Sequence, residues 1–180
     1  MHPFFRRAVL ACCLLTATGL AQADWRQALP EARLVGSADY SFFGFRLYSA
    51  RLWSPTAPLA ADAPFALELT YHRTIERDDL VAASLKEIRR TAGDRVSEAQ
   101  LQAWAEQMRQ AFVDVEPGQR ITGVFLPGQG ARFYFGDRLT HAVDDRAFAR
   151  AFFDIWLSPR TREPERREEL LGLASPRAKP

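Results

Sequence analysis

Two different spacings of apolar residues constrain the fold of this chain more than any single motif does. In residues 65–72, apolar and polar side chains alternate at every second position, which is the spacing of a strand with one buried face. From Asp78 the spacing becomes helical, so that Leu80, Val81 and Ile88 share one face. The two spacings run in blocks: strands, two helices, three strands, then further helices. Segregated blocks predict an α+β fold, an antiparallel sheet with helices packed on one face, rather than a parallel α/β fold.

Glycine and proline positions divide the strand blocks into separate strands. We expect strands at residues 33–40, 41–53, 65–72, 119–126, 131–135 and 138–143. Gly36 and Gly44 indicate bends or bulges, and the proline-containing residues 54–64 indicate a loop. Residues 127–130 and 136–137 are typical of hairpin turns, so we expect the last three strands to form a meander.

Capping residues indicate where the first two helices begin. Asp78 or Asp79 is available as the N-cap of the first helix, and Ser97 with Gln100 forms a capping box for the second. An apolar stripe at helical spacing follows the capping box, and such a stripe predicts core contacts rather than a ligand pocket. Its members are Leu101, Trp104, Ala105, Met108 and Phe112.

Two more helices are expected near the end of the chain. Asp144 or Asp145 is positioned to cap a helix that ends before Pro159, because the proline ring removes a backbone donor. A last short helix is expected to begin at Pro164 and to end at Gly172. We expect the remaining residues, 173–180, to form a disordered tail.

The first 23 residues have the features of an export signal. Arg6 and Arg7 precede an apolar stretch at residues 8–20, and Ala21-Gln22-Ala23 is a small-x-small cleavage pattern. The apolar stretch is shorter than the roughly 20 residues of a membrane-spanning helix. We therefore predict cleavage after Ala23, a periplasmic protein with no transmembrane anchor, and one domain at residues 24–172.

Charge and cysteine content exclude several classes of function. The chain has 24 basic and 22 acidic side chains, and removal of Arg6 and Arg7 with the leader makes the two numbers equal. A balanced chain has no long-range field for gathering nucleic acid. Both cysteines, Cys12 and Cys13, lie in the leader, so no disulfide or thiol nucleophile is expected in the domain. His141 has no second histidine or cysteine at ligand spacing, and we expect neither a metal nor a cofactor.

Polar side chains at the strand ends are the candidates for a functional site. Regular alternation would place Arg46 on the same strand face as Tyr48, although its position beside a glycine also fits the solvent-exposed rim. Tyr71, His72 and Arg73 end the third strand and bring together a phenol, an imidazole and a cation. These groups could serve acid–base chemistry or simply be solvated.

Three segments resemble the chalcone isomerase-like superfamily, and most closely its exported bacterial branch. They are residues 45–53, residues 112–121 and the run from Phe148 to Pro159 before Leu170-Leu171-Gly172. The resemblance implies an open-faced sandwich with a ligand cleft between sheet and helices. It also implies that a hydroxyl on an early strand faces the cleft, and Tyr48 is similar to that position.

The resemblance places an arginine on the strand before this hydroxyl, and the chain departs from the pattern there. Residues 35–40 include no arginine. An anion buried without a charged donor is uncompensated. Near the position where the isomerases carry a late-helix hydroxyl, the chain has Asp154, which would repel an anion.

These observations lead to three hypotheses of different classes. We expect a non-catalytic periplasmic protein that binds a small apolar or amphipathic molecule, of fatty-acid or aromatic-acid type, with Tyr48, Arg46, Tyr71, Arg73 and Asp154 as candidate binding residues. The alternatives are an intramolecular lyase of chalcone isomerase type, with Tyr48 stabilising an oxyanion, and an envelope protein-interaction module.

Overall fold

The computed structural model describes residues 24–42 and 44–174. The predicted export signal at residues 1–23 and the tail beyond residue 174 lie outside the described residues. Leu173 and Ala174, which were assigned to the tail, donate backbone hydrogen bonds to the carbonyl of Glu168 at 2.9 and 3.3 Å. Residues 173 and 174 are therefore hydrogen-bonded to the segment that precedes them.

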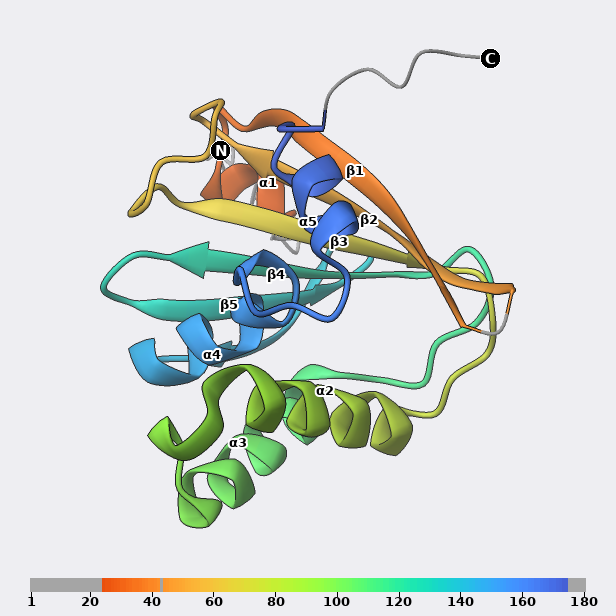
Figure 1. Cartoon of the computed structure of the whole chain (residues 1–180), viewed down its shortest axis with the longest axis vertical. Coiled ribbons are helices and arrows are strands. Elements are labelled where there is room, and N and C mark those ends of the chain that lie inside the picture. The colour runs from red at the N-terminus through yellow and green to blue at the C-terminus, as the bar shows by residue number, and fades with distance from the viewer. Residues whose placement is uncertain (1–23, 43, 175–180) are drawn as a thin grey trace, which may run out of the picture.

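Six strands form one antiparallel sheet in which each strand pairs with its neighbours in sequence, in the order β1-β2-β3-β4-β5-β6 (Figure 1). They are β1 Arg33–Phe42, β2 Phe45–Ser54, β3 Phe65–Tyr71, β4 Arg120–Leu126, β5 Gly130–Phe135 and β6 Arg138–Val143. The predicted antiparallel sheet is confirmed. The first turn lies later than predicted: Phe42 pairs with Phe45, and Gly44 in the turn has φ +78°. Glycine adopts this conformation at little cost, which favours the turn there.

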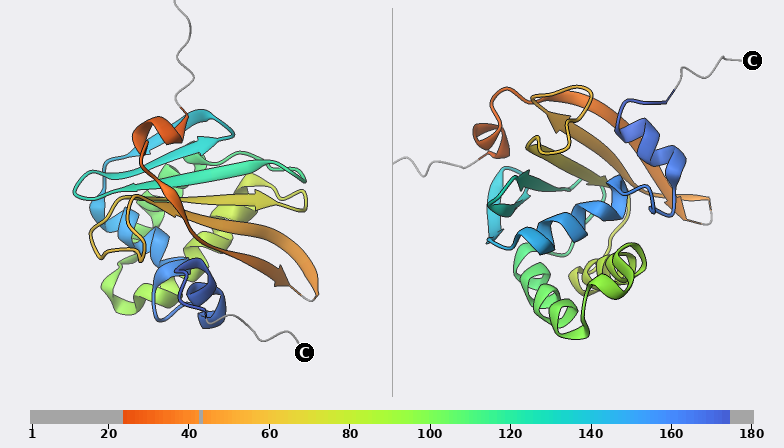
Figure 2. Two further views of the ribbon diagram at one scale, coloured as in Figure 1. Left: turned by 90° about the horizontal axis from the view of Figure 1, so that it is seen from above. Right: turned by 60° about the vertical axis from the view of Figure 1, so that its left-hand side comes forward.

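Helices cover mainly one face of the sheet, as predicted. They are α1 Trp25–Ala28, α2 Arg77–Ala92, α3 Glu98–Ala111, α4 Arg146–Leu157 and α5 Pro164–Leu170, with a 3₁₀ turn η1 at Gly93–Arg95. Figure 2 shows α2, α3 and α4 gathered on the concave side of the sheet, with α5 beside β1 and α1 on the opposite side. The predicted stripe of α3 is buried in the main core, and Met108 is fully buried.

The second face of β3 is buried, contrary to the prediction of a strand with one exposed face. Ala66 and Glu68 alternate with the core residues yet are 0% and 2% exposed. Trp25 of α1 joins Ala66 in a small cluster on this outer face. The Glu68 carboxylate lies 3.8 Å from the guanidinium of Arg51 and 3.9 Å from that of Arg120. These neighbours cover β3 because it is a central strand.

Two of the three predicted helix caps are correct. Ser97 and Gln100 form the capping box of α3. Asp145 caps α4 by accepting from the backbone N–H groups of residues 147 and 148, at 2.8 and 3.0 Å. Neither predicted aspartate caps α2, whose first backbone N–H, on Arg77, donates to Asp114 Oδ1 at 2.8 Å. The cap therefore comes from a residue beyond the next helix.

The fit of α5 against β1 depends on a residue without a side chain. A Cβ atom at Gly36 would collide with the backbone carbonyl groups of Glu169 and Leu170. These are rigid backbone atoms, so a larger residue must push α5 away from the sheet. Leu170, which is fully buried, would lose part of its packing.

We predict that Gly36→Ala lowers the free energy of unfolding by about 1–3 kcal/mol, the usual cost of overpacking. Urea denaturation followed by circular dichroism measures this difference. Ser37→Ala, at the exposed neighbouring position, is the matched control and should change stability by less than about 0.5 kcal/mol. Equal stabilities of the two variants would show that α5 is not held at Gly36.

Candidate functional site

A cavity of about 180 Å³ lies between the inner face of β2–β4 and helices α2 and α4. Leu69 and Ile121 form part of its sheet side, and Phe152 and Ile155 of α4 lie opposite. Most of its wall is apolar, with a few polar groups. This composition is typical of sites that hold small apolar or amphipathic molecules.

Three tyrosines form a row across β1, β2 and β3 at one side of this cavity. Tyr40 is paired with Tyr48, and Tyr48 with Tyr71. The rings of Tyr40 and Tyr48 stack with centroids 4.8 Å apart, and those of Tyr48 and Tyr71 are 6.0 Å apart. Tyr48 and Tyr71 line the cavity. The hydroxyl of Tyr40 is buried and has no hydrogen-bond partner among the described residues.

Tyr48 is oriented by α4. The indole Nε1–H of Trp156 donates to the Tyr48 hydroxyl oxygen at 3.0 Å. Because that oxygen already accepts a hydrogen bond, the hydroxyl proton of Tyr48 is available to an acceptor inside the cavity. Burial is the main cause that raises the pKa of Tyr48 well above its ordinary value; the Trp156 hydrogen bond lowers it, and the charges of Glu163 and Glu87 raise it further. The group is therefore a neutral hydrogen-bond donor.

Small and acidic residues of α2 form the remaining wall. Ala83 and Ser84 occupy positions where larger side chains would fill the space, and the Ser84 hydroxyl donates to the Leu80 carbonyl at 2.8 Å. Asp79 and Glu87 line the cavity from the same helix, one turn to either side of Ala83. The part of the wall contributed by described residues has no lysine, arginine or histidine.

The structure removes Arg46 from the site, although regular alternation had placed it beside Tyr48. The pairing passes from Tyr40–Tyr48 to Ser41–Arg46, which leaves Leu47 as the extra residue of a β-bulge. A bulge reverses which face the following residues occupy. Leu47 therefore lines the cavity, and Arg46 lies on the other face in an exposed ion pair with Asp39 at 2.9 Å.

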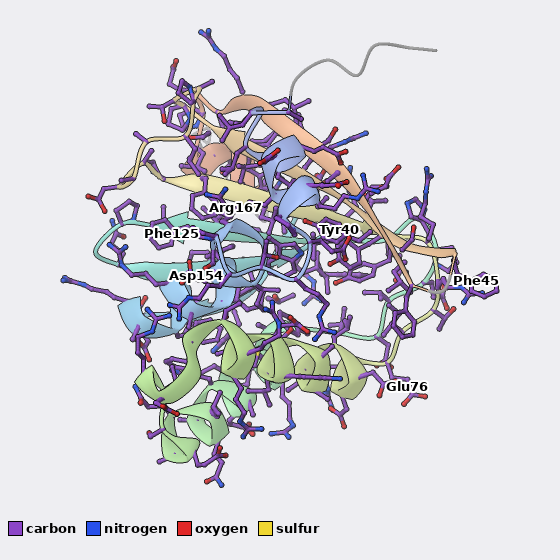
Figure 3. All side chains as sticks on the ribbon, viewed as in Figure 1. Tyr40, Phe45, Glu76, Phe125, Asp154 and Arg167 are labelled. Atoms are coloured by element: carbon purple, nitrogen blue, oxygen red, sulfur yellow. The ribbon has the colours of Figure 1, made fainter. Side chains whose placement is uncertain are left out.

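Arg73 and Asp154 also lie outside this cavity. The guanidinium of Arg73 lies 4.7 Å from the ring centroid of Phe45, which Figure 3 shows at the far tip of the β1–β2 hairpin. Asp154 lines a different cavity, of about 250 Å³, together with Arg167 and Phe125. Burial raises the pKa of Asp154, and neighbouring arginines oppose this effect. Of the five candidate binding residues, the structure brings only Tyr48 and Tyr71 together.

The acid–base group expected at Tyr71, His72 and Arg73 is divided: Tyr71 lines the cavity, whereas His72 contacts Ser49 on the outer face of the sheet. The Ser49 hydroxyl donates to Asp39 Oδ1 at 2.6 Å, and His72 Nε2 lies 2.8 Å from the same hydroxyl oxygen. The serine proton is directed to the carboxylate instead of the imidazole, so the arrangement does not activate Ser49 as a nucleophile. Among residues 24–42 and 44–174, no group of three or more metal-ligating side chains is placed to hold a metal ion.

Sequence reasoning missed Trp156 as the partner of Tyr48, and it missed the α2 residues Ala83, Asp79 and Glu87. Trp156 lies in the predicted helix that ends before Pro159, but no role was predicted for it. A weak signal for the α2 wall was available, because Ala83-Ser84 interrupts the apolar face of that helix with small residues. No sequence signal shows that this interruption faces β2.

Comparisons with known proteins agree with this architecture. A family model described as chalcone isomerase-like matches residues 33–172. An uncharacterized protein of Haemophilus influenzae is 27% identical over 139 residues, which cover 77% of this chain and 67% of that protein. The crystal structure of a fatty-acid binding protein of Arabidopsis thaliana superposes with a TM-score of 0.61 at 14% identity, over 79% of this chain and 87% of that one. Among the described residues, no helix has the length and hydropathy needed to cross a membrane.

The four tyrosines of the chain should stay protonated to unusually high pH. Burial is the main cause that raises the pKa of each of them: Tyr40, Tyr48, Tyr71 and Tyr134. In the unfolded chain the tyrosines titrate at about pH 10. Since the folded values are higher, the tyrosines' contribution to stability is intact below about pH 10 and is lost as the pH rises above it.

We predict that tyrosinate absorbance at alkaline pH appears together with loss of circular dichroism. The tyrosinate absorbance should increase and the circular dichroism should decrease in one transition, because ionisation of the buried tyrosines requires unfolding. If most tyrosines of the native protein titrate at about pH 10, the row of Tyr40, Tyr48 and Tyr71 is not buried.

Proposed function

The chain belongs to the chalcone isomerase-like family, and from that premise we propose that it is a non-catalytic periplasmic protein that binds a small apolar or amphipathic molecule. The observation that carries the proposal is the cavity between the sheet and helices α2 and α4. Its wall is mainly apolar and includes Tyr48, whose hydroxyl is oriented by Trp156. Apolar walls with few directed polar groups are typical of ligand sites.

The structural neighbour supports a binding role. The fatty-acid binding protein of Arabidopsis thaliana shares this fold, although at 14% identity the likeness establishes the fold alone. In this chain Tyr48 is held by Trp156, and no cation lines the described wall. Binding requires only that the cavity exclude water from an apolar group, which this wall can do.

We expect Ala83→Leu to weaken ligand binding by at least about tenfold, because the larger side chain extends into the cavity. Calorimetric titration with a ten-carbon panel, including decan-1-ol and decanoate, measures the effect on whichever member binds the unmodified protein. Native mass spectrometry of the purified protein, followed by extraction, tests for a ligand carried from the cell.

The matched control is Ala82→Leu, the same substitution at the preceding residue, which is exposed like Ala83 but does not line the cavity. It changes helix propensity equally and should leave binding unchanged. An unmodified protein that carries no ligand and binds no panel member would refute the proposal. Equal loss of binding in both variants would place the site elsewhere.

The proposed location rests on the leader. When the full chain is expressed in a bacterium with a periplasm, we expect the protein in the periplasmic fraction with a mass that begins at Asp24. Intact mass spectrometry of that fraction measures the cleavage site. A mature protein that retains residues 1–23 would contradict the predicted cleavage.

A further inference from the structure

We propose that the polar end of the ligand carries no negative charge, so that the cavity favours an alcohol or a carbonyl compound over a free carboxylate. This inference rests on the proposed binding function and specifies its ligand class. It follows from the charges around the cavity. Burying a carboxylate is costly unless a cation or several donors compensate it.

The charged residues that line the cavity are both acidic. Asp79 is exposed at the edge of the wall and forms no ion pair with a described residue. Glu87 lies two helical turns further along α2 and is 22% exposed. A carboxylate ligand in this cavity would meet the unpaired charge of Asp79, and Glu87, which is ion-paired with two arginines, would offer it no compensating charge. Of the two acidic residues, Glu87 also acts on Tyr48 itself: its charge, together with that of Glu163 outside the cavity, raises the pKa of the Tyr48 phenol, although burial is the larger cause.

The two arginines that contact Glu87 are already engaged. Glu87 accepts from Arg90 Nε at 2.7 Å with one carboxylate oxygen and from Arg162 Nη2 at 2.7 Å with the other. Arg90 also donates to the carbonyl of residue 160 at 2.7 Å. An anionic ligand would have to displace Glu87 from both arginines, which would leave that carboxylate uncompensated.

The arginine near the tyrosine row is held in the same way. The charge of Arg166, on α5, lowers the pKa of Tyr40, which burial, the larger cause, raises. Arg166 Nη1 donates to both carboxylate oxygens of Glu169, at 2.8 and 2.9 Å. Among the described residues of the wall, the side-chain hydrogen-bond donors left for a ligand are neutral, and the Tyr48 hydroxyl, oriented by Trp156, is one of them. A hydroxyl or carbonyl oxygen can accept a hydrogen bond from the Tyr48 hydroxyl without bringing a charge into the cavity.

Calorimetric titration of the purified protein with decan-1-ol and with decanoate, at pH 8 and low ionic strength, tests the inference. The two molecules have the same chain and differ in the charge of the polar end. We expect decan-1-ol to bind at least about tenfold more tightly. Decanoate that binds as tightly as decan-1-ol, or more tightly, would overturn the inference while leaving the proposed binding function intact.

The variant Asp79→Lys tests whether the charge of the cavity wall causes the preference for an uncharged ligand. It replaces an unpaired acidic side chain at the cavity with a cation, so decanoate should bind at least about threefold more tightly while decan-1-ol is unaffected. Asp78→Lys is the control, since Asp78 has the same charge in the same helical turn but does not line the cavity. If both variants change decanoate binding equally, the charge of the wall does not set the preference. If neither ligand binds the unmodified protein, this inference fails, and the proposed function fails with it if the protein also carries no ligand and binds no other panel member.

Discussion

The packing of α4 against the sheet is the interaction on which the rest of the structure depends. Phe152 lies at its centre, with its ring centroid 5.1 to 5.9 Å from those of five other aromatic residues. They are Phe112, Phe133, Phe148, Phe153 and Trp156. The same Phe152 lines the cavity, and the next turn of α4 places Trp156 against Tyr48. Core packing and the geometry of the site are therefore set by one helix face. Four of these ring pairs are tilted or edge-to-face and one is stacked, and such close packing leaves the helix few alternative positions.

The cavity lies between the sheet and α2, which packs mainly against α3 and α4. Ala83 and Ser84 leave space that Phe152 and Ile155, from α4, enclose on another side. Asp114 fixes the start of α2 from a distant part of the chain, and the Ile75–Val115 bridge joins the two segments beside it. The acidic side chains of α2 then give the cavity a field that opposes anions, although its row of phenols resembles a site for polar ligands.

The elements of the fold could be predicted largely from local pattern. The capping box at Ser97 and the cap at Asp145 depend on side chains a few residues from the backbone groups they satisfy, so sequence reasoning found both. The cap of α2 was predicted wrongly, because it is supplied by Asp114 across 37 positions of sequence. Likewise the buried outer face of β3 depends on Trp25 and on two flanking arginines, which no strand pattern reveals.

The sequence by itself determined the order of elements, the antiparallel sheet with helices on one face, and the presence of Tyr48 on an early strand, because each depends on local spacing or on the family pattern. Only the tertiary structure decided which side chains surround that tyrosine. One bulge residue, Leu47, turned Arg46 to the opposite face, and the path of α4 brought Trp156 to Tyr48 while carrying Asp154 to another cavity. The physical reason is that a single extra residue in a strand reverses its faces, and the helix contacts join residues 108 positions apart in sequence.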